Sequence, residues 1–113
     1  MHLGMFMQPV HDPKRDFGLV LEEDRQTIVL ADKLGFEECW VGEHISATVE
    51  PITAPLVFLA TLLQETHQIK LGTGVFCLPQ HHPASVAAQA ALFDHLSKGR
   101  FLMGIGTGSL SSD

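Results

Sequence analysis

The sequence has little positive charge. Its 113 residues include seven lysines and arginines against thirteen aspartates and glutamates, which gives a formal net charge of −6. The largest basic cluster is the pair Lys14–Arg15. An acidic surface repels nucleic-acid backbones and anionic lipid headgroups. The charge balance therefore argues against nucleic acid and against a membrane as partner.

Long hydrophobic runs and cysteines are also scarce. No apolar stretch approaches the roughly 20 residues that span a bilayer. The N-terminal MHLGMFMQPVHDP lacks the basic lead and the small-residue cleavage site of a signal peptide. The two cysteines, Cys39 and Cys77, lie in strand-like runs and are expected to be reduced core residues, with one disulfide as the alternative. We expect a cytoplasmic protein.

The chain contains a regular repeat of short apolar runs. Hydrophobic residues make up 45% of the sequence and charged residues 18%, which suits a folded domain with a core. The runs predict four strands, at His2–Met7, Glu38–Gly42, Ile69–Phe76 and Phe101–Gly106. Their starts follow one another at intervals of about 30 to 35 residues, the length of a strand, a helix and two loops.

Three helical patterns lie between these runs, each with apolar residues on one face. Gly35 follows the first pattern and Gly99 the third as stop signals, and Thr53 is a plausible cap of the second, with Pro55 in its first turn. The third helix is expected to begin after Pro83. The residues on the three apolar faces are Leu21, Ile28 and Ala31; Leu56, Leu59, Ala60 and Leu63; and Val86, Ala90 and Phe93.

Strands joined by single helices are parallel and buried on both faces, which accounts for the unbroken apolar runs. Two α/β architectures use this unit, the doubly wound sheet and the (β/α)₈ TIM barrel, and the even spacing favours the barrel. A barrel needs eight units and roughly 250 residues. We therefore expect residues 1–113 to form the N-terminal half of a barrel, about its first four strands and three helices, as a fragment of a longer chain.

Polar residues follow the second predicted strand directly, as Glu43 and His44. In both architectures ligands bind at the carboxyl ends of the strands. The pair is therefore a candidate for catalysis. A satisfied polar pair that closes the strand is an equally good interpretation.

Glycines and histidines mark the next two strand ends. Gly72 and Gly74 interrupt the third strand, which indicates close approach of another group, a bulge, or tight packing. His81 and His82 point in divergent directions and have no third ligand at helical spacing, so no metal site is expected. The GIGTGS of residues 104–109 is not the dinucleotide-binding fingerprint and is a weak phosphate-loop signal.

Three blocks together resemble the bacterial luciferase-like family of flavin-dependent monooxygenases. They are GFEECWVGEH at 35–44, KLGTGVFCLPQHHP at 70–83 and LFDHLSKGRFLMGIGTG at 92–108, in the family's order and spacing. The resemblance implies a TIM barrel that binds reduced FMN, supplied by a flavin reductase. It also implies reaction of the flavin with O₂ to a flavin hydroperoxide, which transfers one oxygen to a small organic substrate.

The resemblance carries roles to the end of the second strand and to the third. His44 falls at the position of an active-site base or hydrogen-bond donor, and Glu43 could orient it. Gly74–Val75 falls where the family often has a cis peptide bond beneath the flavin ring. Gly72 and Gly74 would then give clearance to the cofactor.

The fourth strand departs from luciferase itself. Gly106 stands in place of a reactive cysteine and Thr107 in place of a phosphate-contacting arginine. Both remain candidate cofactor-binding residues, but Thr107 could offer phosphate only a neutral hydrogen bond. Ile45 replaces a second histidine and makes that wall of the pocket more apolar.

Two alternatives to the monooxygenase stay open. One is a deazaflavin-dependent oxidoreductase of the same superfamily, which moves hydride instead of oxygen. The other is a non-catalytic half-barrel that binds another chain. A half-barrel has open strand edges, so a homo-oligomer is expected. The residues name neither the substrate nor the roles of His81 and His82.

Overall fold

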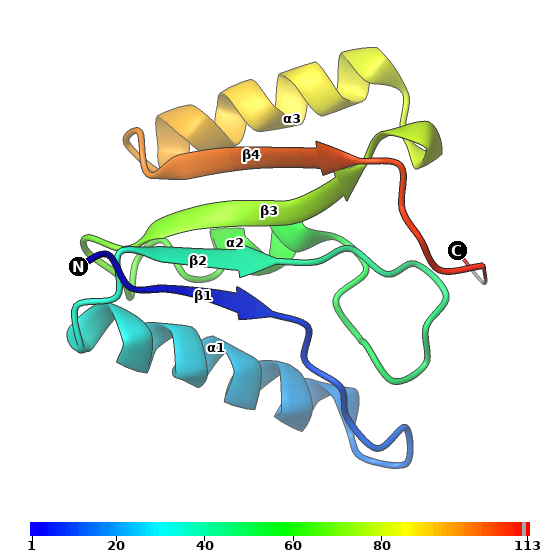
Figure 1. The fold of residues 1–113 in the computed structure, drawn as a ribbon, viewed down its shortest axis with the longest axis horizontal. Helices are drawn as coiled ribbons and strands as arrows, with labels where there is room; N and C mark the ends of the chain where they lie inside the picture. The colour runs from blue at the N-terminus through cyan, green and yellow to red at the C-terminus, as the bar shows by residue number, and fades with distance from the viewer. Residues whose placement is uncertain (112) are drawn as a thin grey trace.

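A single four-stranded parallel sheet forms the centre of the computed structural model, which describes residues 1–111 and 113 (Figure 1). The strands are β1 (Gly4–Met7), β2 (Glu38–Val41), β3 (Lys70–Cys77) and β4 (Phe101–Gly106), in the order β1-β2-β3-β4. Sequential order with parallel pairing throughout is the arrangement of barrel strands. The α/β fold class and the four strands are confirmed, with ends that differ from the predicted ones by at most two residues.

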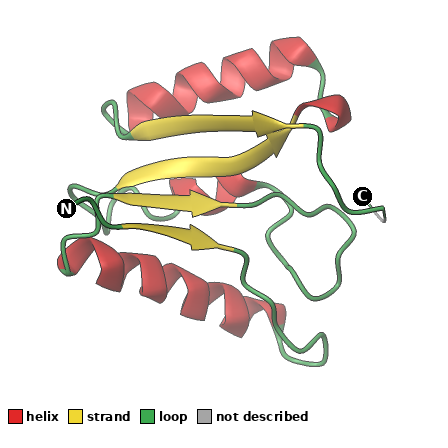
Figure 2. Ribbon diagram, in the orientation of Figure 1, coloured by secondary structure: helices red, strands yellow, loops and turns green. Residues whose placement is uncertain are grey.

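Three α-helices connect the strands on the outside of the sheet (Figure 2). They are α1 (Phe17–Lys33), α2 (Pro55–Ala60) and α3 (Pro83–Leu96), and a 3₁₀ turn, η1 (Leu78–Gln80), precedes α3. Helix α3 packs against β4, and α2 packs against β3 and α3. Each connection from one strand to the next is therefore a helical crossover, as the repeat predicts.

Local signals set most helix ends, but one prediction is wrong. Asp16 caps α1 by accepting a hydrogen bond from the backbone N–H of Leu19, and Gly35 follows the helix at a φ of 86°. The N-cap position of α2 is Ala54, which forms no capping hydrogen bond, instead of Thr53, and the helix ends at Ala60, before Leu63.

A side chain of α1 binds the residue that follows α2. Arg25 of α1 donates to the carbonyl oxygen of Thr61, at 3.0 Å, and to its hydroxyl, at 2.8 Å. The hydroxyl in turn donates to the carbonyl of Phe58. The residue after the helix is therefore bound to α1, and its own N–H donates to the carbonyl of Phe58, three residues earlier, as in a tighter turn.

The two faces of the sheet have different surroundings. Alternate side chains such as Cys39, Val41 and Leu71 are buried under the helices in one apolar core. The other face carries Phe6, which is 59% exposed, and Trp40. Cys39 and Cys77 are both buried free thiols, so the single disulfide is not formed, and burial raises the pKa of Cys39 to about 12.

The pairing of β3 with β4 is interrupted where β3 approaches its carboxyl end. The register shifts between Thr73 and Phe76. There the buried hydroxyl of Thr73 donates to the carbonyl of Gly104 at 2.8 Å and accepts from its N–H at 3.1 Å. One side chain thus satisfies two backbone groups beside the irregular step.

A buried carboxylate binds the segment at the amino end of β3. Asp32, in the last turns of α1, accepts hydrogen bonds from three consecutive backbone N–H groups, those of His67, Gln68 and Ile69. Burial alone would raise the pKa of Asp32, but these donors outweigh it and hold the pKa below its usual 3.8. The segment that leads into β3 is therefore fixed to α1 by one side chain.

We expect Asp32→Ala to lower the free energy of unfolding by about 2–4 kcal/mol, because three backbone donors lose a charged acceptor. Asp12→Ala, which removes one exposed bond to Lys14, should cost less than about 1 kcal/mol. Since the folded pKa of Asp32 is lowered, its contribution is complete above the unfolded pKa and is lost as the pH falls through the folded value. Urea unfolding of both variants over an acidic pH series measures this, and equal losses in the two variants would contradict it.

Candidate functional site

The carboxyl ends of the strands enclose a cavity of about 210 Å³. Its walls come from the residues that follow β1 and β2, from the end of β3 and from the segment after β4. In Figure 1 these segments meet on the side of the sheet to which the strand arrows point. The lining residues are Phe6, Gln8, Glu43, His44, Gly74, Val75, Cys77, Gly108, Ser109 and Asp113.

His44 lies in this cavity between two carboxylates. Its Nε2 is 3.3 Å from Oε1 of Glu50, and its Nδ1 is 3.4 Å from Oδ2 of Asp113. The backbone N–H of His44 donates to the carbonyl of Ile52, which fixes the loop after β2. Nδ1 is buried and forms no hydrogen bond within the described part of the chain. The carboxylates of Glu50 and Asp113 thus flank the two ring nitrogens of His44.

Asp113 is held chiefly by Ser46. Its carboxylate accepts hydrogen bonds from the backbone N–H and the hydroxyl of Ser46, both at 2.9 Å. The Ser46 N–H is the main cause of a lowered pKa of Asp113, with the hydroxyl and His44 adding to it. The segment after β4 thus reaches across the strand ends to the loop after β2.

Glu43 is bound on the other side of its strand end. Its fully buried carboxylate accepts the N–H of Cys77 at 3.1 Å and lies 2.5 Å from Nε2 of His81. Among the described residues these are its polar partners, and the ring of His44 is not one of them. The expectation that Glu43 orients the His44 ring directly is therefore wrong, whereas a catalytic role through other contacts stays a prediction.

The glycines of β3 are covered by side chains of this chain. A Cβ on Gly72 would lie 2.6 Å from the Trp40 indole, and one on Gly74 would lie 2.8 Å from the Phe6 ring. The clearance at these glycines thus serves Trp40 and Phe6. The peptide bond Gly74–Val75 is cis, as the resemblance implies, and lines the cavity. Cofactor binding by Gly72, Gly74 and Val75 stays a prediction.

Gly106, the last residue of β4, and Thr107, which follows it, are not in the lining of the cavity. A Cβ on Gly106 would lie 2.8 Å from Cγ2 of Val75. The exposed Thr107 donates from its hydroxyl to the carbonyl of Gly108 at 3.3 Å. The structure therefore brings His44, Glu43, Gly74 and Val75 together, with Gly106 adjoining them.

The sequence patterns did not indicate several groups at the site. Glu50, His81 and Asp113 contact the two candidate catalytic residues, and Phe6 and Gln8 form one wall of the cavity. Phe6 carries a signal, because it alternates with the buried Met7 at the end of β1. The others lie in loops without a period that could reveal them.

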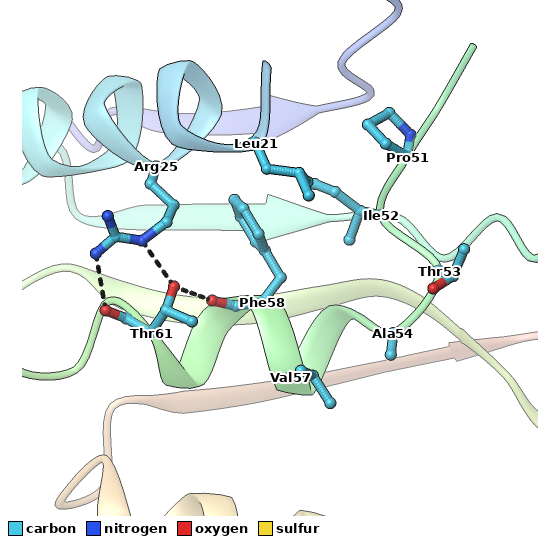
Figure 3. A pocket seen from close by; sticks show the side chains of 9 residues that line it. All are labelled: Leu21, Arg25, Pro51, Ile52, Thr53, Ala54, Val57, Phe58 and Thr61. Carbon is cyan, nitrogen blue, oxygen red and sulfur yellow. Dashed lines mark hydrogen bonds between the residues drawn. The ribbon is translucent and has the colours of Figure 1, made fainter. Parts of the chain in front are cut away.

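A second cavity, of about 260 Å³, lies between α1, α2 and the loop before α2 (Figure 3). Leu21, Ile52 and Phe58 point into it, and Arg25 lies at its rim. The guanidinium of Arg25 is engaged by Thr61, Glu22 and Glu65. This cavity is apolar, lies on the helical side of the sheet and offers no group for catalysis.

Two kinds of feature are absent from residues 1–111 and 113. No three histidine, cysteine, aspartate or glutamate side chains in this part of the chain converge as a metal site. No helix in it combines the length and the apolar character needed to cross a bilayer.

Parallel βα units in sequential barrel order define the class as part of a (β/α)₈ barrel. The chain belongs to the luciferase-like monooxygenases, whose family model matches residues 1–113. It is similar to the 4-hydroxyprotoasukamycin monooxygenase of Streptomyces nodosus subsp. asukaensis, with 47% identity over 97% of this chain. It is also 44% identical, over 97% of its length, to limonene 1,2-monooxygenase of Rhodococcus erythropolis.

The chain spans 30% and 28% of the lengths of these two relatives. A third relative, 35% identical over 73% of this chain and 23% of its own, is the oxygenase component of the flavin-dependent trigonelline monooxygenase of Acinetobacter baylyi. The match to the family confirms the resemblance found in the sequence.

Solved structures show the same barrel segment. The oxygenating constituent of 3,6-diketocamphane monooxygenase of Pseudomonas putida, solved in complex with FMN, superposes with a TM-score of 0.93 at 28% identity, over 97% of this chain and 30% of that one. The coenzyme F420 dependent tetrahydromethanopterin reductase of Methanopyrus kandleri gives 0.76 at 25% identity, over 98% and 28%. The fold class is that of these TIM barrels.

Proposed function

We propose that the protein to which residues 1–113 belong is a flavin-dependent monooxygenase that uses reduced FMN and O₂ to oxygenate a small organic substrate. The observation that carries the proposal is the His44 ring, which lies between two carboxylates in the same cavity as Gly74 and Val75. Monooxygenases among the relatives and FMN in a similar structure support the choice of reaction and cofactor.

The residues of the cavity fit one side of a flavin site. A flavin ring is flat and largely apolar with polar atoms at its edge, and such ligands are held by apolar walls with few polar groups. Phe6 and Val75 supply apolar wall, and the backbone of Gly74 has no side chain to extend over it. His44 and Gln8 supply polar atoms at the rim.

Reduced FMN, when bound, would supply the electrons that activate O₂. The chain would control proton transfer and exclude water. His44 exchanges a proton with the reacting groups, while Glu50 and Asp113 flank its two ring nitrogens. Phe6 and Val75 exclude water from this side of the reaction. Thr107 is the candidate for a neutral hydrogen bond to the cofactor phosphate, with Gly106 and Gly72 as neighbouring backbone.

A second candidate function is a deazaflavin-dependent oxidoreductase. The F420-dependent reductase with the same fold is the observation that favours it. Lower structural similarity to that enzyme than to the FMN-bound monooxygenase places it second.

The test uses the full-length protein with FMN, a flavin reductase and a panel of small organic substrates. We expect substrate-dependent O₂ consumption with an oxygenated product and no reaction with reduced F420. Oxidation of F420 coupled to substrate reduction without O₂ use would favour the second candidate. A full-length protein that binds neither cofactor would contradict both enzyme functions and favour the non-catalytic half-barrel.

The expected partners follow from the same proposal. A flavin reductase would supply the reduced cofactor, as the oxygenase component among the relatives suggests for a two-component system. Each of β1 and β4 pairs with one strand within the described residues, and such edges favour association with further strands. We therefore also propose that residues 1–113 form an N-terminal half-barrel, which further barrel units complete. We propose in addition that the protein is a homo-oligomer and that it is cytoplasmic.

A further inference from the structure

We propose that His81 is a positioning residue, which holds Glu43 and thereby the end of β3 against the cavity. The proposal rests on the proposed function for what the cavity binds, but not for the contacts themselves. It gives a role to the first histidine of the HHP stretch.

The contact joins two strand ends that are far apart in sequence. Glu43 follows β2, and His81 follows the 3₁₀ turn η1 after β3 (Figure 1). One carboxylate oxygen of Glu43 meets Nε2 of His81, and the other accepts the N–H of Cys77, the last residue of β3. Glu43 therefore clamps both ends of the segment 77–81.

Burial makes the clamp dependent on His81. The side chain of Glu43 is 0% exposed, and a buried carboxylate is costly unless donors satisfy it. His81 is 27% exposed and its ring packs edge-on against Phe76, with the ring centroids 4.5 Å apart. A carboxylate can only accept, so Nε2 of His81 carries the hydrogen in this pair.

The clamped segment forms part of the cavity wall. Cys77 lines the cavity together with Gly74 and Val75, three and two residues earlier on the same strand. A shift at Cys77 therefore changes the wall on which the substrate or cofactor would rest. A misplacement of about 1 Å by a group outside the chemistry can lower a rate by about 10²-fold.

The neighbouring histidine provides a matched control. His82 is exposed and its Nδ1 accepts the N–H of Ala84, so it caps α3 and does not contact Glu43. His82→Ala should lower the urea midpoint of unfolding, because α3 loses its cap. It should leave kcat and the spectrum of bound flavin unchanged.

The experiment compares His81→Ala, His81→Gln and His82→Ala in the full-length protein. Three measurements are made: kcat and KM for oxygenation, the visible circular dichroism of bound FMN, and hydrogen exchange at the amide of Cys77. We expect His81→Ala to lower kcat about 10²-fold with a smaller change in KM, to alter the flavin spectrum and to speed exchange at Cys77. His81→Gln keeps an N–H donor for Glu43 and should recover most of each loss.

The outcomes separate this inference from the proposed function. Wild-type kcat, spectrum and exchange in His81→Ala would overturn the inference, and so would a glutamine variant no better than alanine. A wild-type protein that binds no flavin would overturn the proposed function alone. The exchange at Cys77 would then still decide whether His81 holds the strand end.

Discussion

Replacing His44 with alanine is expected to lower substrate oxygenation by about 10²- to 10⁴-fold, the range for a lost acid–base group. The imidazole is the titratable ring in the cavity whose Nδ1 has no hydrogen bond within the described residues, and Glu50 and Asp113 flank it. Affinity for FMN should change little, because the apolar wall of Phe6 and Val75 is untouched. Steady-state kinetics of the full-length protein and a flavin titration measure the two effects.

His95→Ala is the matched control for this variant. His95 is an exposed histidine in the last turn of α3 and lies outside the cavity lining. Its loss should leave both turnover and flavin affinity as in the wild type. Normal turnover in His44→Ala would instead identify His44 as a structural residue that closes β2.

Gly104→Ala is expected to cost about 3 kcal/mol or more of folding free energy, the upper range for overpacking. A Cβ at this position would lie 2.2 Å from the backbone oxygen of Thr73. The clashing atom belongs to a neighbouring strand, and the Thr73 hydroxyl binds both the N–H and the carbonyl of Gly104. Neither strand can therefore move without breaking these bonds.

Urea unfolding of this variant is compared with that of Gly4→Ala. A Cβ on Gly4 would find its nearest neighbours at 3.6 Å, an ordinary contact, so that variant should change stability by less than about 1 kcal/mol. A Gly104→Ala protein as stable as the wild type would show that the β3–β4 step relaxes more easily than its hydrogen bonds indicate.

The sequence predicts the repeating part of this fold well because repetition is a local property. Strand β4 falls at the predicted residues, and Gly35 and Gly99 follow α1 and α3 at positive φ as stop signals. The end of α2 could not be predicted in this way. The residue after it is bound by Arg25, 36 residues away in the sequence, and no local pattern records such a contact.

The candidate site shows the same division. His44 and the cis Gly74–Val75 bond are found from the residues themselves and from their resemblance to a family. The partner of Glu43 is not found, because His81 lies 38 positions further along the chain. The missing Cβ of a glycine predicts that another group can approach its backbone closely. Packing decides which group that is, and at Gly72 it is Trp40.

Trp40 is the only tryptophan of the sequence. Its indole rests on Gly72 on the face of the sheet opposite the helices, and its N–H donates to Glu38 at 3.1 Å. The intrinsic fluorescence of these residues therefore comes from a single emitter in the middle of the sheet. Its emission wavelength and intensity depend on the polarity around the indole. The fluorescence of an unlabelled sample therefore reports when a ligand, a second chain or solvent reaches this face of the sheet.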